Sequence, residues 1–171
     1  RDTDRSRGLG DVYKRQEQTI PQYYDKLGFS YNKFADSITV SETEWDFERY
    51  KPDIIVINLG TNDMNYATTD ERKAEFEDGY LDFLKKVRSL NSDSYIFQTY
   101  GVMGTSLEEN IENVRRKYIS ETGDERITFI PLTMQDEDAD GIVADWHPSP
   151  RTHSLVSQKV TAAIKETLGY K

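Results

Sequence analysis

Residues 54–59 constrain the fold of this chain most, because they form a nearly uninterrupted run of β-branched and other apolar residues. Such a run is typical of a strand that is buried on both faces of a parallel sheet. Residues 94–100 and 126–131 predict two further strands, and helical patterns separate and follow them. Right-handed connections between parallel strands place helices on both faces. The sequence therefore predicts a three-layer α/β/α fold.

Three segments carry the signals of helices that cover this sheet. The first follows Thr69, and the second follows Ser106, which we expect to form a capping box with Glu109. The third begins at Ser149 and Pro150, a residue pair typical of a helix N-terminus. Its predicted buried face consists of Leu155, Val156, Val160, Ile164 and Leu168.

Composition excludes several classes of protein. The chain has 171 residues, 36% of them hydrophobic, which is enough for one globular domain. Its formal net charge of -9 argues against nucleic acid or an anionic membrane as a partner. The chain contains no cysteine, which excludes disulfides, thiolate zinc sites and a cysteine nucleophile. We therefore expect a single acidic domain that binds neither nucleic acid nor membrane.

Residues 1–16 show neither a helical nor a strand period, and residues 6–16 resemble a translated transposase-type sequencing adaptor. We interpret residues 1–16 as an adaptor-derived or disordered tail and exclude them from the fold. Residues 17–171 then form the domain. Because three strands make a small sheet for this architecture, we expect an N-terminally truncated fragment that lacks its first strand or strands.

The predicted functional residues follow the ends of the predicted strands. In open α/β sheets, ligands bind at the carboxyl ends of the strands. Residues 60–63 follow the first strand and include the amide side chain of Asn62, while residues 132–148 follow the third and include His147. We expect this amide and this imidazole to lie in one crevice.

These two segments resemble known sequence blocks. Residues 57–63 resemble the third block, GxND, of the SGNH (GDSL-type) esterase family, and residues 145–149 resemble its fifth block. More narrowly, residues 45–53 and 147–153 are similar to carbohydrate esterase family 2, whose members remove acetyl groups from plant polysaccharides. The resemblance covers about residues 17–168. It implies the flavodoxin-like fold of SGNH hydrolases and a carboxylic ester hydrolase that uses a serine and a histidine.

The resemblance also implies roles for individual residues. Asn62 would donate a hydrogen bond to the oxyanion, and His147 would act as general base and then as general acid. Gly60 would provide a tight turn and room for substrate. Trp146 would form a wall of the sugar site, with ordinary packing as the alternative interpretation.

One element of the family's catalytic triad is displaced in this chain. The family places an aspartate three residues before the histidine, where this sequence has Ala144. Asp145 lies one residue later. The sequence therefore leaves open whether Asp145 or a backbone carbonyl orients His147.

The nucleophile is the second departure from the family pattern. Residues 35–39 mimic the Gly-Asp-Ser block and would offer Ser37, but only 22 residues separate Ser37 from Gly60. That spacing is too short for a crossover helix, a second strand and the glycine block that the family places between them. We therefore expect the nucleophile to lie upstream, in the remainder of the same domain, and this chain to show little or no activity.

We predict no metal and no cofactor. Residues 136–141 begin like a calcium-binding EF-hand loop, but the twelfth position is His147 instead of glutamate. The resemblance implies an acetylated polysaccharide or oligosaccharide as partner, and a secreted or cell-surface location. Two alternatives remain open, a non-catalytic carbohydrate-binding α/β domain and a flavodoxin-like binding or regulatory domain.

Overall fold

The computed structural model describes residues 19–28, 33–34 and 38–170. The segment that we interpret as a tail (residues 1–16) and the candidate nucleophile Ser37 lie outside these residues.

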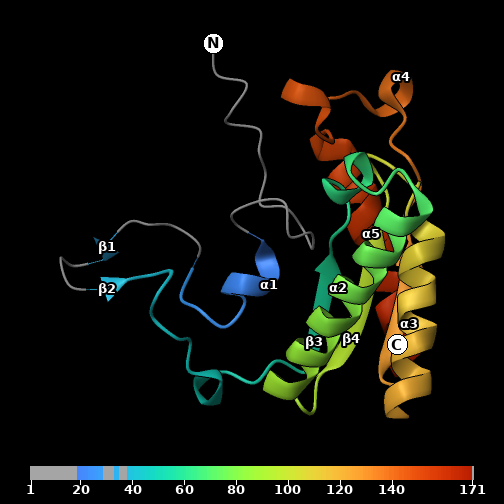
Figure 1. Cartoon of the computed structure of the whole chain (residues 1–171). Coiled ribbons are helices and arrows are strands. Elements are labelled where there is room, and N and C mark those ends of the chain that lie inside the picture. Colours follow the sequence, from blue (N-terminus) through green and yellow to red (C-terminus); the bar gives the residue numbers. More distant parts are fainter. Residues whose placement is uncertain (1–18, 29–32, 35–37, 171) are drawn as a thin grey trace.

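A parallel sheet of three strands forms the centre of the fold (Figure 1). Its strands are β3 (Ile54–Asn58), β4 (Tyr95–Tyr100) and β5 (Ile127–Pro131), in the spatial order β3-β4-β5. Val56 pairs with Phe97, which in turn pairs with Thr128. The three strands predicted from the sequence are confirmed, each to within one residue at either end.

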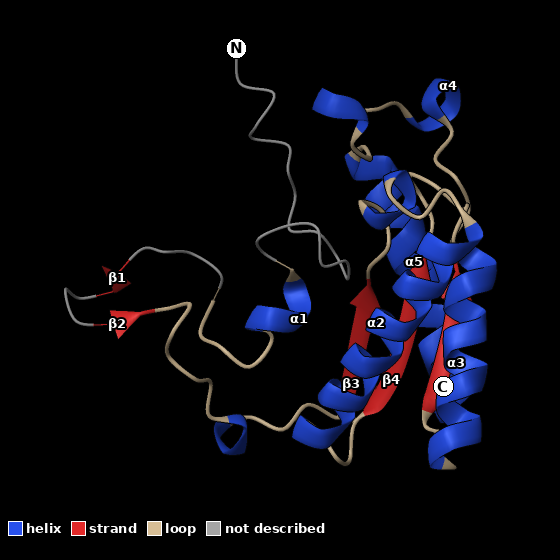
Figure 2. Cartoon of the chain, viewed as in Figure 1, coloured by secondary structure: helices blue, strands red, loops and turns tan. Residues whose placement is uncertain are grey.

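Helices cover both faces of the sheet, as the sequence predicts (Figure 2). On one face, α2 (Asp70–Leu90) and α3 (Glu108–Thr122) pack against Ile57 and Ile96 in the larger of two apolar clusters. On the other face, α5 (Pro150–Leu168) packs against Phe97 and Ile130. The three-layer α/β/α fold is therefore confirmed.

Short elements connect and flank these layers. They are α1 (Ile20–Tyr23), β1 (Lys33–Phe34), β2 (Ile38–Thr39), η1 (Phe47–Arg49), η2 (Asp63–Asn65), α4 (Glu137–Asp140) and η3 (Ala144–Trp146). β1 and β2 form a separate antiparallel pair. The segment around α1 is attached to α2, because Lys86 Nζ lies 2.9 Å from Asp25 Oδ1 and donates to the Pro21 carbonyl at 2.8 Å.

The helix N-termini are only partly as predicted. Thr69 caps α2 and Ser149 caps α5, each accepting a backbone N–H through its side chain. The predicted capping box of Ser106 and Glu109 is wrong, because the N-cap of α3 is Leu107, which makes no side-chain cap. Residues 105–108 instead form a turn that is closed by backbone groups, from Glu108 N–H to the carbonyl of residue 105 at 3.1 Å.

The prediction that the first strand is buried on both faces is also wrong. β3 is an edge strand of the described sheet, and the Val56 side chain is 47% exposed on the face that α5 covers elsewhere. Leu155, predicted to be buried, is 48% exposed. An apolar run identifies a strand but does not reveal how far the covering helix extends, and α5 packs mainly over β4 and β5.

The opposite edge of the sheet ends in a proline. Leu132 donates its N–H to the Tyr100 carbonyl of β4 at 2.7 Å, so the nitrogen of the preceding Pro131 faces away from β4. Proline has no N–H, and Pro131 is solvent-exposed at the end of β5. The outer edge of β5 therefore lacks a hydrogen-bond donor at this position.

Candidate active site

The loops that carry the predicted site residues leave the same end of the sheet (Figure 1). Asn62 follows β3 and His147 lies in the segment after β5, while residues 101–105 follow the central strand β4. The parallel topology therefore brings the predicted amide and imidazole to one edge, although their catalytic roles remain predictions.

The loop after β3 makes a close turn over a buried tyrosine. Gly60 has a φ of 116°, and a Cβ atom there would lie 3.1 Å from the Tyr100 ring. Only glycine adopts this conformation without strain. Met64 donates its N–H to the Gly60 carbonyl at 3.0 Å, which closes the turn around half-buried Asn62. Gly60 thus provides the tight turn that the sequence predicts.

Met64 connects this turn to the loop after β4. The Tyr100 hydroxyl, on a side chain with no exposed surface, donates to Met64 Sδ at 3.8 Å. A Cβ atom at Gly104 would overlap Met64 Sδ, so the absence of a side chain at Gly104 makes room for the thioether. The two loops therefore interlock through Met64, whose contacts with Tyr100 and Gly104 hold the turn that carries Asn62 against the loop after β4.

A backbone carbonyl orients His147. Its Nδ1 lies 3.0 Å from the Ala144 carbonyl oxygen, which also accepts the His147 backbone N–H at 3.2 Å. Since a carbonyl only accepts, the neutral imidazole donates through Nδ1–H and keeps Nε2 as an acceptor. Among the described residues, no hydrogen bond joins the Asp145 carboxylate to this ring. Of the two possibilities left open by the sequence, the geometry thus favours the carbonyl.

The turn that holds His147 has an unusual backbone. Asp145 and Trp146 both lie in the left-handed region, with φ values of 54° and 63°. Both side chains are exposed, that of Trp146 to 65%, and His147 is exposed beside them. The imidazole and the indole are therefore both accessible to a large ligand.

Sequence reasoning missed one residue that contacts this turn. Gln135 donates through Nε2 to the Trp146 carbonyl at 2.8 Å. A glutamine in a loop without periodicity gives no signal in the sequence, because its partner lies eleven residues away in the same irregular segment.

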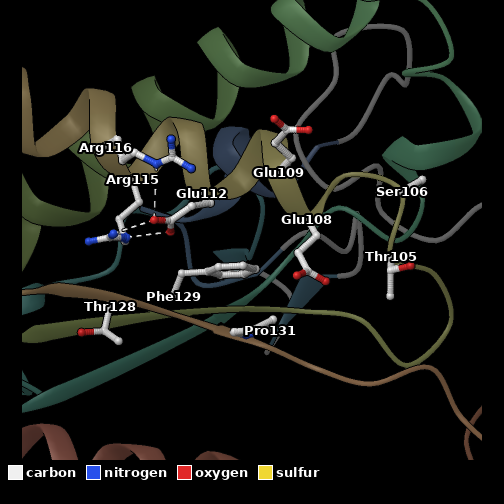
Figure 3. A pocket seen from close by; sticks show the side chains of 10 residues that line it. All are labelled: Thr105, Ser106, Glu108, Glu109, Glu112, Arg115, Arg116, Thr128, Phe129 and Pro131. Atoms are coloured by element: carbon white, nitrogen blue, oxygen red, sulfur yellow. Dashed lines mark hydrogen bonds and ion pairs between the residues drawn. The ribbon is translucent and has the colours of Figure 1, made fainter.

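A hollow of about 760 Å³ lies between α3 and β5, away from the loops that carry Asn62 and His147 (Figure 3). The Phe129 ring lies within it, and on one wall Arg115 contacts both carboxylate oxygens of Glu112, at 2.6 and 2.8 Å. The hydrogen bond from Arg115 holds the pKa of Glu112 below its ordinary value. Neither Asn62 nor His147 lines this hollow, so it is separate from the candidate site.

The acidic loop before His147 has a structural role. The Asp136 side chain accepts the backbone N–H groups of Asp138 and Ala139, at 3.1 and 2.9 Å, and so caps α4. Within the described ranges, no three His, Asp or Glu side chains gather closely enough to hold a metal ion.

A parallel α/β/α sheet with an amide loop and an imidazole loop at its carboxyl edge defines the class of open α/β domains, in which ligands bind at that edge. The chain belongs to the GDSL-like Lipase/Acylhydrolase family, whose family model matches residues 3–155. The resemblance to SGNH (GDSL-type) enzymes is thereby confirmed.

The similar proteins are carbohydrate esterases. The chain is 34% identical over 148 residues to the cellulase/esterase CelE of Acetivibrio thermocellus, a match that spans 81% of the chain and 17% of that protein. A family two carbohydrate esterase from Clostridium thermocellum, solved in complex with cellohexaose, has 30% identity and a TM-score of 0.77 over 96% of this chain and 49% of its own.

An acetyl xylan esterase from the rumen bacterium Butyrivibrio proteoclasticus shares the fold, with a TM-score of 0.80 and 24% identity over 90% of this chain and 46% of its own. The chain thus spans about half the length of these solved relatives and less of CelE.

Proposed function

We propose that the protein removes O-acetyl groups from carbohydrate by a serine/histidine mechanism. The observation that carries this proposal is the hydrogen bond from His147 Nδ1 to the Ala144 carbonyl, which leaves Nε2 available as a base at the edge where Asn62 lies. The activities of the similar proteins, a cellulase/esterase and an acetyl xylan esterase, support it.

The proposed reaction needs three groups. His147 Nε2 takes the proton of a serine hydroxyl, whose oxygen attacks the acetyl carbonyl, and the Asn62 amide donates to the oxyanion that forms. The intermediate collapses when the imidazolium gives its proton to the departing sugar oxygen, which leaves an acetylated serine. A water molecule, deprotonated by His147, then releases acetate and restores the serine.

In this proposal the serine of the scheme lies upstream of the adaptor-like residues 1–16, in the remainder of the same domain. Two observations support this part of the proposal. Ser37 is too near Gly60 in the sequence for the intervening elements of the family. The exposed edge and the 47% exposed Val56 of β3 also offer a place for a further strand.

The proposed substrate is an acetylated polysaccharide or oligosaccharide. Trp146, 65% exposed beside His147, presents an indole ring against which a sugar ring can stack. The cellohexaose complex of one relative supports a chain of sugars as ligand. Such polymers are extracellular, so we propose a secreted or cell-surface protein. No helix in the described part of the chain is long and apolar enough to cross a membrane.

Hydrolysis of 4-nitrophenyl acetate and of acetylated xylan tests the proposal. The 171-residue chain and a version extended by its upstream gene sequence are compared, each with His147→Ala and Asn62→Ala variants. We expect activity only in the extended protein, and a loss of about 10²–10³-fold in kcat for Asn62→Ala. Activity of the chain alone that disappears in Ser37→Ala would instead identify Ser37 as the nucleophile.

The exposed indole of Trp146 also favours a second candidate, a non-catalytic carbohydrate-binding domain. That function predicts binding of cellohexaose by the extended protein, lost in Trp146→Ala, without turnover of either ester.

A further inference from the structure

We propose that Gln135 is a positioning residue that holds the turn of residues 144–147, and with it the imidazole of His147, in its catalytic orientation. The inference rests on the proposed role of His147 as the base. Its starting point is the bond from Gln135 Nε2 to the Trp146 carbonyl, immediately before His147.

The turn needs support because its backbone is strained. Two consecutive residues with side chains, Asp145 and Trp146, adopt left-handed conformations that such residues rarely take. The bonds from Val143 N–H to the His147 carbonyl and from His147 to the Ala144 carbonyl all lie within the turn itself. They fix the shape of the turn and its base, while its two ends are joined by the bridge between Ile142 and Pro148. None of these bonds joins the turn to the loop after β4.

Gln135 joins the turn to the central strand. Its backbone N–H donates to the Val102 carbonyl at 2.9 Å, and Val102 is buried directly after β4. Beside it, a Cβ atom at Gly101 would overlap the Leu132 carbonyl, so the segments after β4 and β5 are packed closely together. Besides the chain connection from His147 to Ser149 at the start of α5, one path from the sheet to His147 therefore runs through Val102, Gln135 and the Trp146 carbonyl.

The chemistry of the glutamine amide fixes its orientation. If the amide were rotated by 180°, Oε1 would face the Trp146 carbonyl oxygen, and two acceptors would repel each other. Gln135 Oε1 is buried and has no hydrogen-bond partner within the described ranges. The orientation of the Gln135 amide thus depends on the one hydrogen bond that its Nε2 donates to the Trp146 carbonyl.

Loss of this bond would allow residues 144–147 to relax toward ordinary backbone conformations. The Ala144 carbonyl would then leave its place opposite Nδ1, and the imidazole would lose the partner that selects its tautomer. We therefore expect Gln135 to control which ring nitrogen of His147 carries the proton.

Nitrogen-15 NMR of the imidazole rings tests this in the chain as it exists, without need for enzymatic activity. The chain contains only two histidines, and His153, exposed on α5, serves as the internal reference. Spectra are recorded at alkaline pH for the wild type, Gln135→Met, which removes the amide at similar length, and Gln135→Glu, which replaces the donor by an acceptor. Gln158→Met is the matched control, because Gln158 Nε2 donates to Ser154 Oγ at 3.3 Å on the exposed surface of α5.

We expect the Nδ1–H tautomer to predominate for His147 in the wild type and in Gln158→Met. In both Gln135 variants, the ratio of Nδ1–H to Nε2–H should fall about fivefold, the equilibrium change that one net hydrogen bond produces. An unchanged ratio for His147 in either folded Gln135 variant would overturn the inference. The ester assay reports separately on the proposed function, since its failure leaves the tautomer ratios unaffected.

Discussion

Gly104→Ala tests whether the two loops at the carboxyl edge interlock through Met64. Gly104 is buried and is not among the glycines with positive φ, so its backbone conformation suits alanine. The added methyl group, however, would occupy the space of Met64 Sδ. The substitution therefore measures how firmly the thioether is held between Gly104 and the Tyr100 hydroxyl.

Two opposing effects determine how much Gly104→Ala changes the free energy of unfolding. Overpacking of a filled space costs about 1–3 kcal/mol. Replacing glycine by alanine lowers the entropy of the unfolded chain and returns about 0.4–1 kcal/mol. We expect a net loss of about 0–2.6 kcal/mol in the free energy of unfolding. In a Met64→Ala background the clash is absent, so the same substitution should be neutral or stabilising, which gives a coupling energy of about 1–3 kcal/mol.

Urea denaturation of the wild type, both single variants and the double variant gives this coupling energy. Gly123→Ala is the matched control. Gly123 ends α3 in a left-handed conformation, and a Cβ atom there would have no neighbour within 4 Å, so its cost of about 1 kcal/mol comes from the backbone alone. This cost should be independent of Met64. A coupling energy below about 0.5 kcal/mol between Gly104 and Met64 would refute the interlock.

Two predictions concern other parts of the fold. Arg88 donates to the carbonyls of residues 91, 92, 94 and 126, and its Nε lies 2.6 Å from Asp124 Oδ2. Arg88→Met should therefore lower the free energy of unfolding by about 2–4 kcal/mol, measured by urea denaturation. A loss below about 1 kcal/mol would contradict this. Because Arg115 lowers the pKa of Glu112, this carboxylate stabilises the fold above its unfolded pKa of about 4.3 and ceases to do so as the pH falls through the lower folded value. Glu112→Gln should therefore cost about 0.5 kcal/mol at neutral pH and nothing in strong acid, and an equal cost at both would exclude the ion pair as its cause.

Local patterns in the sequence predict the strands and main helices well. The β-branched run that becomes β3 and the Ser149–Pro150 start of α5 depend on neighbouring residues, and the structure confirms both. Errors occur where distant parts of the chain decide the outcome. The exposure of Val56 and Leu155 depends on where α5 lies over the sheet. The hydrophobic periodicity of a short segment contains no information about that position.

In the candidate site, too, the sequence predicts what the strand order determines and misses what distant contacts determine. Asn62 and His147 follow strands, so parallel topology alone predicts that their loops share an edge. The partner of the imidazole is the Ala144 backbone carbonyl, and every residue type offers one, so the sequence contains no signal for it. Gln135 cannot be predicted either, because the strained turn that it contacts is visible only in the backbone angles.

Pro131 gives the two sides of the sheet different capacities for self-association. A polypeptide added next to β5 finds no donor at the position of Pro131, whereas β3 (Ile54–Asn58), at the other edge of the described sheet, contains no proline. In a chain without the further strand proposed beside β3, edge-to-edge pairing is therefore directed to β3, where two copies related by a two-fold axis would use up each other's edge. Such an assembly is a closed pair and not a growing fibre, because the remaining outer edges both carry the proline.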